Sequence, residues 1–321
     1  MNPLIRRFTT DDYPAVVAVH NAVYPDYPDT EAETRFYDEH RDQKCHFERW
    51  VAERDDAVVA VGQFGQAAGW YHPQKFWMEL AVHPDHQGRG VGSALYDHIL
   101  AALRPLDPLV IRAGTREDKD HSVQFLANRG FHEDMRSWES RLDVAAFDPS
   151  PYAGVGESAR AQGIEIKTLR ELAADPNRDA KLYEQDWELE QDVPHPEPLT
   201  RIDVAFWEEH TLRNPNLLPD GYFVAVDGDA YVGVSTLWTS QGNDDLYTGL
   251  TGVKRTHRRR GIALALKLRA IAFARTLGRP AIRTWNDSNN RAMLSINERL
   301  GFVKQPAWID YAKVFATDDD R

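Results

Sequence analysis

The chain has 321 residues, of which 42% are hydrophobic and 27% charged, so it is long enough for two globular domains with separate cores. Its single cysteine, Cys45, excludes an intrachain disulfide framework and a CxxC-type metal site, and the histidines lack metal-ligand spacing, so we expect no metal. The formal net charge of −12 argues against a nucleic-acid partner, and no apolar run approaches the roughly 20 residues of a membrane span.

The first half is predicted to open with a strand and two helices, which begin near Tyr13 and Glu31. Three antiparallel strands are expected near Val58, Gly69 and Leu80. A helix, a strand, a second helix and a last strand complete the order.

The second half repeats this order after a segment rich in Pro, Gly, Ser and Ala at 143–163, which is typical of a surface linker, alone or with an edge strand. Asp227-Gly228 between two apolar runs predicts a hairpin. We expect an N-terminal domain over 1–150, a linker over 151–162 and a C-terminal domain over 163–321. The expected elements are strands at 164–169, 222–226, 230–237, 246–253 and 281–285, and helices at 178–190, after Thr200, from Gly261 and at 292–300.

The two halves share one register. ELAVHPDHQGRGVGSALYDHIL at 79–100 resembles GLTGVKRTHRRRGIALALKLRA at 249–270, and 253 − 82, 261 − 90 and 301 − 130 all give 171. An ungapped match over this length indicates a duplication.

Each copy contains a Q/R-x-x-G-x-G/A turn between a strand and a helix. The first amides of a helix lack intrahelical partners and, with the helix dipole, favour an anion. Small residues let the backbone approach a diphosphate closely. A single such turn is equally consistent with a mere tight turn, but two copies in one register favour an anion site. The basic segment 254–261 is either a solvated loop or part of such a site, which we prefer because Arg258 occupies the first motif position.

These motifs resemble those of the GNAT superfamily of acyl-CoA-dependent N-acetyltransferases, present twice. VHPDHQGRGVGSAL and VKRTHRRRGIALAL are similar to its acyl-CoA motif, and NDSNNRAMLSINERLGF to the strand–helix motif that follows. The likeness covers both halves apart from the linker and is strongest at 79–131 and 249–302. The tandem layout resembles that of the mycothiol synthases, although architecture alone does not transfer a substrate.

The resemblance implies an α/β (α+β) fold of two tandem domains, each with a mixed, mostly antiparallel, splayed sheet flanked by helices. It implies acetyl-CoA as co-substrate, with the pantetheine arm between the fourth and fifth strands and a backbone amide near Val82 or Val253 as oxyanion donor. Arg255, Arg259 and Arg260 are either rim charges or partners of the CoA 3′-phosphate. The implied cofactor-binding residues are Val82, Gln87, Gly88, Arg89, Gly90, Val91, Gly92 and Ser93 in the first copy, and Val253, Arg258, Arg259, Arg260, Gly261, Ile262, Ala263, Asn286 and Asn290 in the second.

Direct attack by an amine requires a base and an acid. The resemblance implies Glu79, three residues before Val82, as the base of the first half. The aligned residue of the second half is Leu250, so Asp245 and Tyr247, acting through water, are its candidates. The tyrosine that the family uses as acid falls on Leu126 and Asn297, which do not titrate usefully, so solvent or another tyrosine must protonate the thiolate.

The two halves differ in how well they retain the residues of the implied site. The second has Asn286 and Asn290 where the first has Thr115 and Lys119, so it keeps the better cofactor contacts, while the first keeps the better base. Both halves are expected to fold alike, with either both halves active or one half silent in catalysis. The acidic run at 184–192 either recognises a cationic acceptor or, as we prefer, is a solvated helix.

The predicted function is transfer of an acetyl group from acetyl-CoA to a primary amine of a small molecule. The alternative is a CoA-binding regulatory or scaffold protein. We expect a small-molecule amine and CoA as partners, no nucleic acid, no membrane, and a monomer or homodimer. Because no apolar segment follows the N-terminal MNPLIRRFTT, we expect a cytoplasmic location.

Overall fold

The computed structural model describes residues 3–316 and confirms the expected order of elements. Gly69, expected in a strand, lies instead in the short 3-10 turn between the second and third antiparallel strands. The elements of the first half are β1 (Leu4–Arg7), α1 (Tyr13–Val23), α2 (Glu31–Glu39), β2 (Phe47–Arg54), β3 (Ala57–Gly65), β4 (Lys75–Val82), α3 (Val91–Leu103), β5 (Val110–Arg116), α4 (Asp120–Ala127) and β6 (His132–Asp143).

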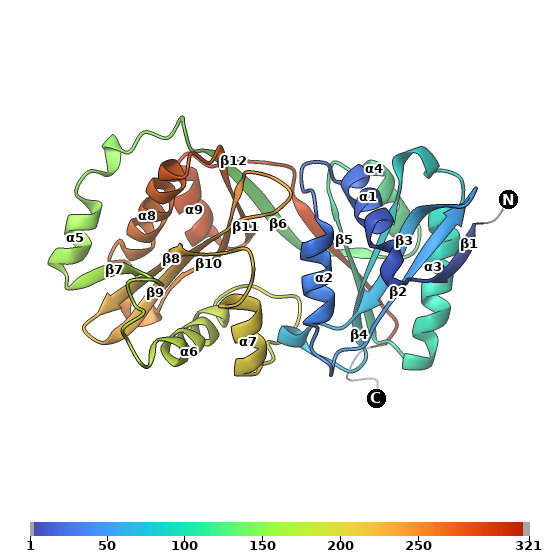
Figure 1. Ribbon diagram of the computed structural model, residues 1–321, viewed down its shortest axis with the longest axis horizontal. Coiled ribbons are helices and arrows are strands. Elements are labelled where there is room, and N and C mark those ends of the chain that lie inside the picture. Colours follow the sequence, from blue (N-terminus) through green and yellow to red (C-terminus); the bar gives the residue numbers. More distant parts are fainter. Residues whose placement is uncertain (1–2, 317–321) are drawn as a thin grey trace.

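The second half forms the other lobe of Figure 1 and is preceded by a short helix, α5 (Val155–Ala161), which the composition of the linker did not predict. The hairpin at Asp227-Gly228 is confirmed, with Gly228 at φ +59°. The remaining elements are β7 (Ile164–Thr168), α6 (Arg178–Glu190), α7 (Val204–Thr211), β8 (Leu217–Asp227), β9 (Ala230–Trp238), β10 (Leu246–Val253), α8 (Ile262–Thr276), β11 (Ala281–Asp287), α9 (Arg291–Arg299), β12 (Val303–Lys304) and β13 (Trp308–Val314).

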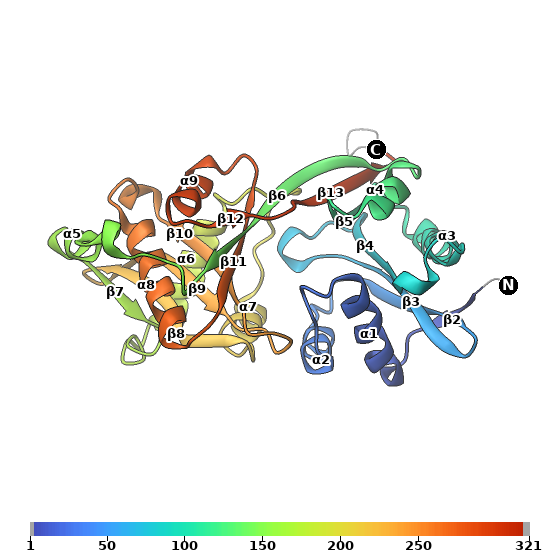
Figure 2. The same ribbon diagram turned by 90° about the horizontal axis from the view of Figure 1, so that it is seen from above.

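Within residues 3–316, thirteen strands form one sheet that continues through both halves, in the order β1-β2-β3-β4-β5-β13-β6-β11-β10-β9-β8-β7, with β12 on β6. Each half donates its last strand to the other. The second part of β6 pairs with β11 and β12, whereas β13 lies between β5 and the first part of β6. In Figure 2, β6 runs from one lobe into the other and β13 lies beside it in the first lobe.

The exchange keeps the register of the duplication. Asp310 of β13 lies opposite Gly114 of β5, and Glu139 of β6 lies opposite Trp285 of β11. Both 310 − 139 and 285 − 114 give 171, so the repeat extends to the exchanged strands.

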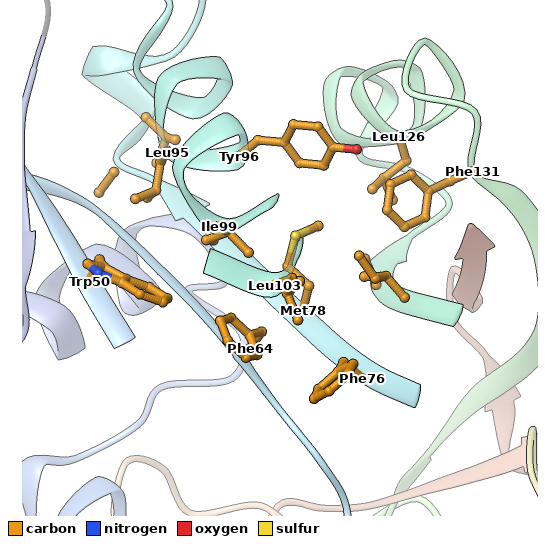
Figure 3. Close-up of a cluster of buried hydrophobic side chains, with 14 of the residues drawn as sticks. Trp50, Phe64, Phe76, Met78, Leu95, Tyr96, Ile99, Leu103, Leu126 and Phe131 are labelled. Carbon is orange, nitrogen blue, oxygen red and sulfur yellow. The ribbon is translucent and has the colours of Figure 1, made fainter. Parts of the chain in front are cut away.

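The core of the first half lies between the sheet and α3 (Figure 3). Leu95, Ile99 and Leu103 recur at i, i+4 and i+8 on α3 and are fully buried against Phe64 and Met78. Full burial of each such side chain contributes roughly 1.5–3 kcal/mol. The equivalent face of α8 covers the sheet of the second half.

The sheet splays between corresponding strands in each half. The parallel pairing of β4 with β5 ends at Trp77 opposite Arg112, and that of β10 with β11 ends at Tyr247 opposite Arg283. The expected gap between the fourth and fifth strands is therefore present in each half. Among the described helices, none is long and apolar enough to cross a membrane.

Candidate functional site

The first turn is shaped by two glycines. Gly88 and Gly90 have φ of +69° and +81°, a left-handed conformation that favours glycine, and Gly90 is the N-cap of α3. No atom lies within 4 Å of a Cβ built on Gly90, so the approach to the helix N-terminus is open. The side-chain amide of Gln87 donates from Nε2 to the carbonyl of Val82 at 2.9 Å, which holds the turn against the end of β4.

The rest of the first turn surrounds this opening. Val91 is buried below it, Gly92 packs on the Val82 side chain, and Arg89 is exposed. Ser93 accepts a hydrogen bond from Arg129 at 2.8 Å. Because the first amides of α3 face an unobstructed surface, these residues fit a diphosphate.

A cavity of about 800 Å³ runs from this turn through the gap between β4 and β5 to the opposite face of the sheet. At one end it is lined by Gln87, Gly88, Gly90, Gly92 and Ser93. Its middle part follows the free edges of the two strands, and its far end lies under α1 and the loop after it. The residues of that far end include His20, Tyr24, Tyr27, Asp29, Trp77, Glu79, Trp308 and Asp310.

Glu79 lies in this cavity and is held by a polar chain. Gln63 donates to one carboxylate oxygen at 2.7 Å, and Nδ1 of His20 lies 3.2 Å from the other. The Gln63 oxygen accepts from Arg49 at 2.6 Å, which fixes the amide so that its NH₂ group faces Glu79. Arg49 is anchored in turn by Asp38. A carboxylate so placed beside the gap can take a proton from an amine in the cavity.

The position of the usual acid is apolar or blocked in both halves. Leu126 is buried in the core, and Asn297 is buried and donates to Asn286 at 2.7 Å. A tyrosine that the sequence did not single out lies in the cavity instead: the hydroxyl of Tyr24 is 3.3 Å from that of Thr115. Burial raises the pKa of Tyr24, so its phenol keeps a proton to donate at neutral pH.

The second turn has the same backbone but different surroundings. Gly261 is the N-cap of α8 at φ +77°, Ile262 is buried and Ala263 partly buried. Arg258 donates to the carbonyl of Val253 at 3.0 Å, as Gln87 does to Val82. Arg259 occupies the place of Gly88 with φ +61°, a conformation that costs a non-glycine residue about 1 kcal/mol.

Carboxylates neutralise most of the basic segment. Asp192 binds both Arg255 and Arg258, and these arginines hold the pKa of its carboxyl below its usual range. Lys254 pairs with Glu188 at 2.8 Å. Arg260 donates to Gln162 and lies 3.7 Å from Asp227, which leaves Arg259 as the cation of the segment without an ion pair in the described residues.

The acidic run at 184–192 therefore serves the protein itself. Beside Glu188 and Asp192, Glu184 pairs with Arg201 and Glu190 with His195. Asp186 accepts from Trp207 at 2.9 Å. Most of the run is helical, as the sequence favoured, but its acids pair with neighbouring side chains and do not form a merely solvated face.

The candidate base residues of the second half are also engaged. Asp245 is buried and accepts from Arg283 at 2.7 Å. Tyr247 accepts from Asn243 and stacks on Trp285. The two asparagines act structurally: Asn286 accepts from Asn297, and Asn290 caps α9 through the amide of Met293.

The space beneath the second gap is occupied by side chains. Trp285 stands where the first half has Gly114, and its ring faces those of Tyr27 and Tyr247. Glu139, which is 0% exposed, pairs with Arg283 at 3.0 Å and accepts from the Tyr27 hydroxyl. The first half thus retains the open cavity, and the second half fills the corresponding space.

The cavity of the first half also takes residues from the second half, which sequence reasoning missed. Trp308 and Asp310 arrive on β13, and Pro196 and Glu197 on the loop between α6 and α7. Glu197 binds Lys75 and Arg112 at 3.1 and 2.5 Å. The duplication alone assigns each of these residues to the second half and does not show that they line a cavity of the first.

Comparisons with known proteins agree with this architecture. The sequence profile of the Acetyltransferase (GNAT) family matches residues 10–131 and 174–302. The chain is 26% identical over 247 residues to the mycothiol acetyltransferase of Pseudarthrobacter chlorophenolicus, covering 74% of this chain and 70% of that one. It is 25% identical over 253 residues to that of Geodermatophilus obscurus, covering 73% of each.

Two solved structures share the whole fold. One is a tandem GNAT protein from the clavulanic acid biosynthesis pathway, with a TM-score of 0.77 and 17% identity over 99% of this chain and 100% of that one. The other is a GCN5-related N-acetyltransferase from Sphaerobacter thermophilus, with a TM-score of 0.71 and 19% identity over 98% and 96%. The chain therefore belongs to the acetyltransferase (GNAT) family, with one copy of the fold in each half, and is an acyltransferase of a family whose co-substrate is acetyl-CoA.

Proposed function

We propose that the chain transfers an acetyl group from acetyl-CoA to a primary amine of a small molecule, and that the reaction takes place in the first half. The observation that carries the proposal is the cavity of about 800 Å³ that joins the open turn at Gly90 to Glu79 through the gap between β4 and β5. The filled space around Trp285 and the arginine pairs of Asp192 argue against a second reaction centre.

Acetyl-CoA would supply the activated acyl carbon. In the reaction the amine nitrogen bonds to that carbon, the carbon–sulfur bond breaks, and CoA leaves as the thiolate. Glu79 takes the proton that the amine loses, while His20 and Gln63 hold its carboxylate in place. Tyr24 lies in the same cavity and offers its phenol proton to the thiolate, with solvent as the alternative donor.

The contribution of Glu79 is tested by Glu79→Gln, which keeps the hydrogen bond to His20 or Gln63 but cannot accept the proton. We expect kcat to fall roughly 100- to 10,000-fold at unchanged acetyl-CoA affinity. The assay is release of free thiol across a panel of primary amines. A Glu53→Gln variant is the matched control, because Glu53 lies near the end of β2, pairs with Arg6 and does not line the cavity. Near wild-type kcat in Glu79→Gln would remove Glu79 from the reaction.

The choice of half is tested with Gly90→Glu, Gly261→Glu and the double variant, since a glutamate repels a diphosphate at either turn. We expect Gly90→Glu to abolish both acetyl-CoA binding in calorimetric titration and turnover, and Gly261→Glu to keep both. Melting temperatures check that the variants fold. Loss of turnover in Gly261→Glu alone would move the reaction to the second half. Tight binding of CoA without turnover of any amine would instead favour a regulatory or scaffold role.

A further inference from the structure

The far end of the cavity carries a carboxylate that has no partner within residues 3–316. Asp310 reaches this space from β13, and a Cβ on Gly114 would lie 3.2 Å from its Oδ1, so the glycine keeps room around it. No hydrogen bond or ion pair to the Asp310 carboxylate is found among the described residues.

The neighbouring cation is committed elsewhere. Arg112 donates to Asp134 at 2.9 Å, to Glu197 at 2.5 Å and to the carbonyl of Pro196 at 3.2 Å. Burial raises the pKa of Asp310, Asp134 adds to the rise and Arg112 opposes it. An ionised carboxylate in this setting is stabilised by a cation that enters the cavity.

In the second half, the carboxylate at the equivalent position is paired within the protein. Glu139 occupies the place of Asp310 in the duplication, and it is neutralised by Arg283 and by the hydroxyl of Tyr27. Trp285, in the place of Gly114, closes the space beside it. Since the fold satisfies this position internally in one half, its openness in the other half indicates a ligand.

The spacing of the acidic groups defines that ligand. Glu79 on β4 and Asp310 on β13 are separated by β5, so at a strand spacing of about 4.8 Å their backbones lie about 10 Å apart. Trp77 and Trp308 line the cavity from the same two strands and offer apolar faces to a chain that bridges this distance.

We propose that the acceptor is a diamine, whose reacting amine lies at Glu79 while its second, cationic nitrogen is bound by Asp310. This inference rests on the proposed function, because it names the substrate class of the same cavity. The second half of the chain then acts as the specificity element of the first, since it supplies Asp310 and Trp308.

The test compares 1,5-diaminopentane with 1-aminopentane as acceptors for wild type, Asp310→Asn and Asp310→Glu. Wild type is expected to favour the diamine in kcat/KM by about ten- to a hundredfold. Asp310→Asn is expected to remove this preference by raising KM for the diamine at little change in kcat, and Asp310→Glu to restore most of it. Glu133→Gln, an exposed acid on β6 that pairs with Arg136, is the matched control.

Equal use of both amines by wild type, or an equal loss of both in Asp310→Asn with an unchanged melting temperature, would overturn the inference. Calorimetric titration of 1,5-diaminopentane separates it from the proposed function. Binding that Asp310→Asn weakens, without thiol release from any amine, would support the subsite and reject the transferase role. Binding of equal strength to wild type and Asp310→Asn would reject the subsite whatever the turnover.

Discussion

We expect Asp192 to control whether acetyl-CoA binds at the second turn. Its carboxylate binds Arg258, at the first position of the turn, and Arg255, which are 44% and 73% exposed in their side chains. We expect Asp192→Asn to release both guanidinium groups toward solvent and so to create a functional diphosphate site at the N-terminus of α8.

The size of the effect follows from two terms. Each of these half-exposed ion pairs stabilises the protein by roughly 0.2–1 kcal/mol. In wild type a diphosphate has to break these pairs to bind, and in Asp192→Asn it does not. Repulsion between the Asp192 carboxylate and a diphosphate near 5 Å adds roughly 1–3 kcal/mol at an effective dielectric constant of about 40–80. Allowing for screening by salt, acetyl-CoA binding at the second turn should tighten about ten- to a hundredfold.

The assay is calorimetric titration with acetyl-CoA in a Gly90→Glu background, so that the first turn does not contribute. Asp229→Asn, which removes an exposed carboxylate paired with Lys181, controls for the change in net charge. Because the pKa of Asp192 lies below its usual range, titration at pH 5 should leave the wild-type second turn blocked. Identical weak binding in Asp192→Asn and in the control, or two equal sites in wild type, would refute the reasoning.

Two further results are expected. Truncation after Gln305 removes β13, which carries Ile309 and Tyr311 of the core of the first half. Acetyl-CoA binding and the melting temperature of the first half should both fall, although residues 1–150 are intact. An unchanged titration would contradict the pairing of β13 with β5. Burial raises the pKa of Asp186 to about 7, so its carboxyl holds a proton in the folded state that the unfolded chain has lost. The free energy of unfolding should therefore fall as the pH rises from about 4 to about 7, by at most about 1.4 kcal/mol per pH unit. Asp186→Asn should flatten this part of the plot of unfolding free energy against pH. A slope equal to that of wild type would show that another group is responsible.

The sequence by itself determined the features that local interactions specify. The offset of 171 between Gly90 and Gly261 revealed the duplication, and the polar stretch at 178–190, predicted to be helical, is α6 with the same bounds. The strand–turn–helix pattern predicted that a helix begins at Gly90 and at Gly261, and both glycines are N-caps of the observed helices. These predictions succeeded because backbone conformation in turns and helices depends mainly on nearby residues.

The tertiary structure was needed to see how the surroundings of the two turns differ. Nothing in the local pattern of β13 shows that it pairs with β5 of the other half, because register and strand partners are set by contacts distant in sequence. The same holds for Asp192, whose acidic neighbourhood suited either an acceptor or a solvated helix until its arginine partners were known. Whether a charged group is free to bind a ligand depends on which opposite charges the fold brings within reach, and that is settled by long-range packing and not by composition.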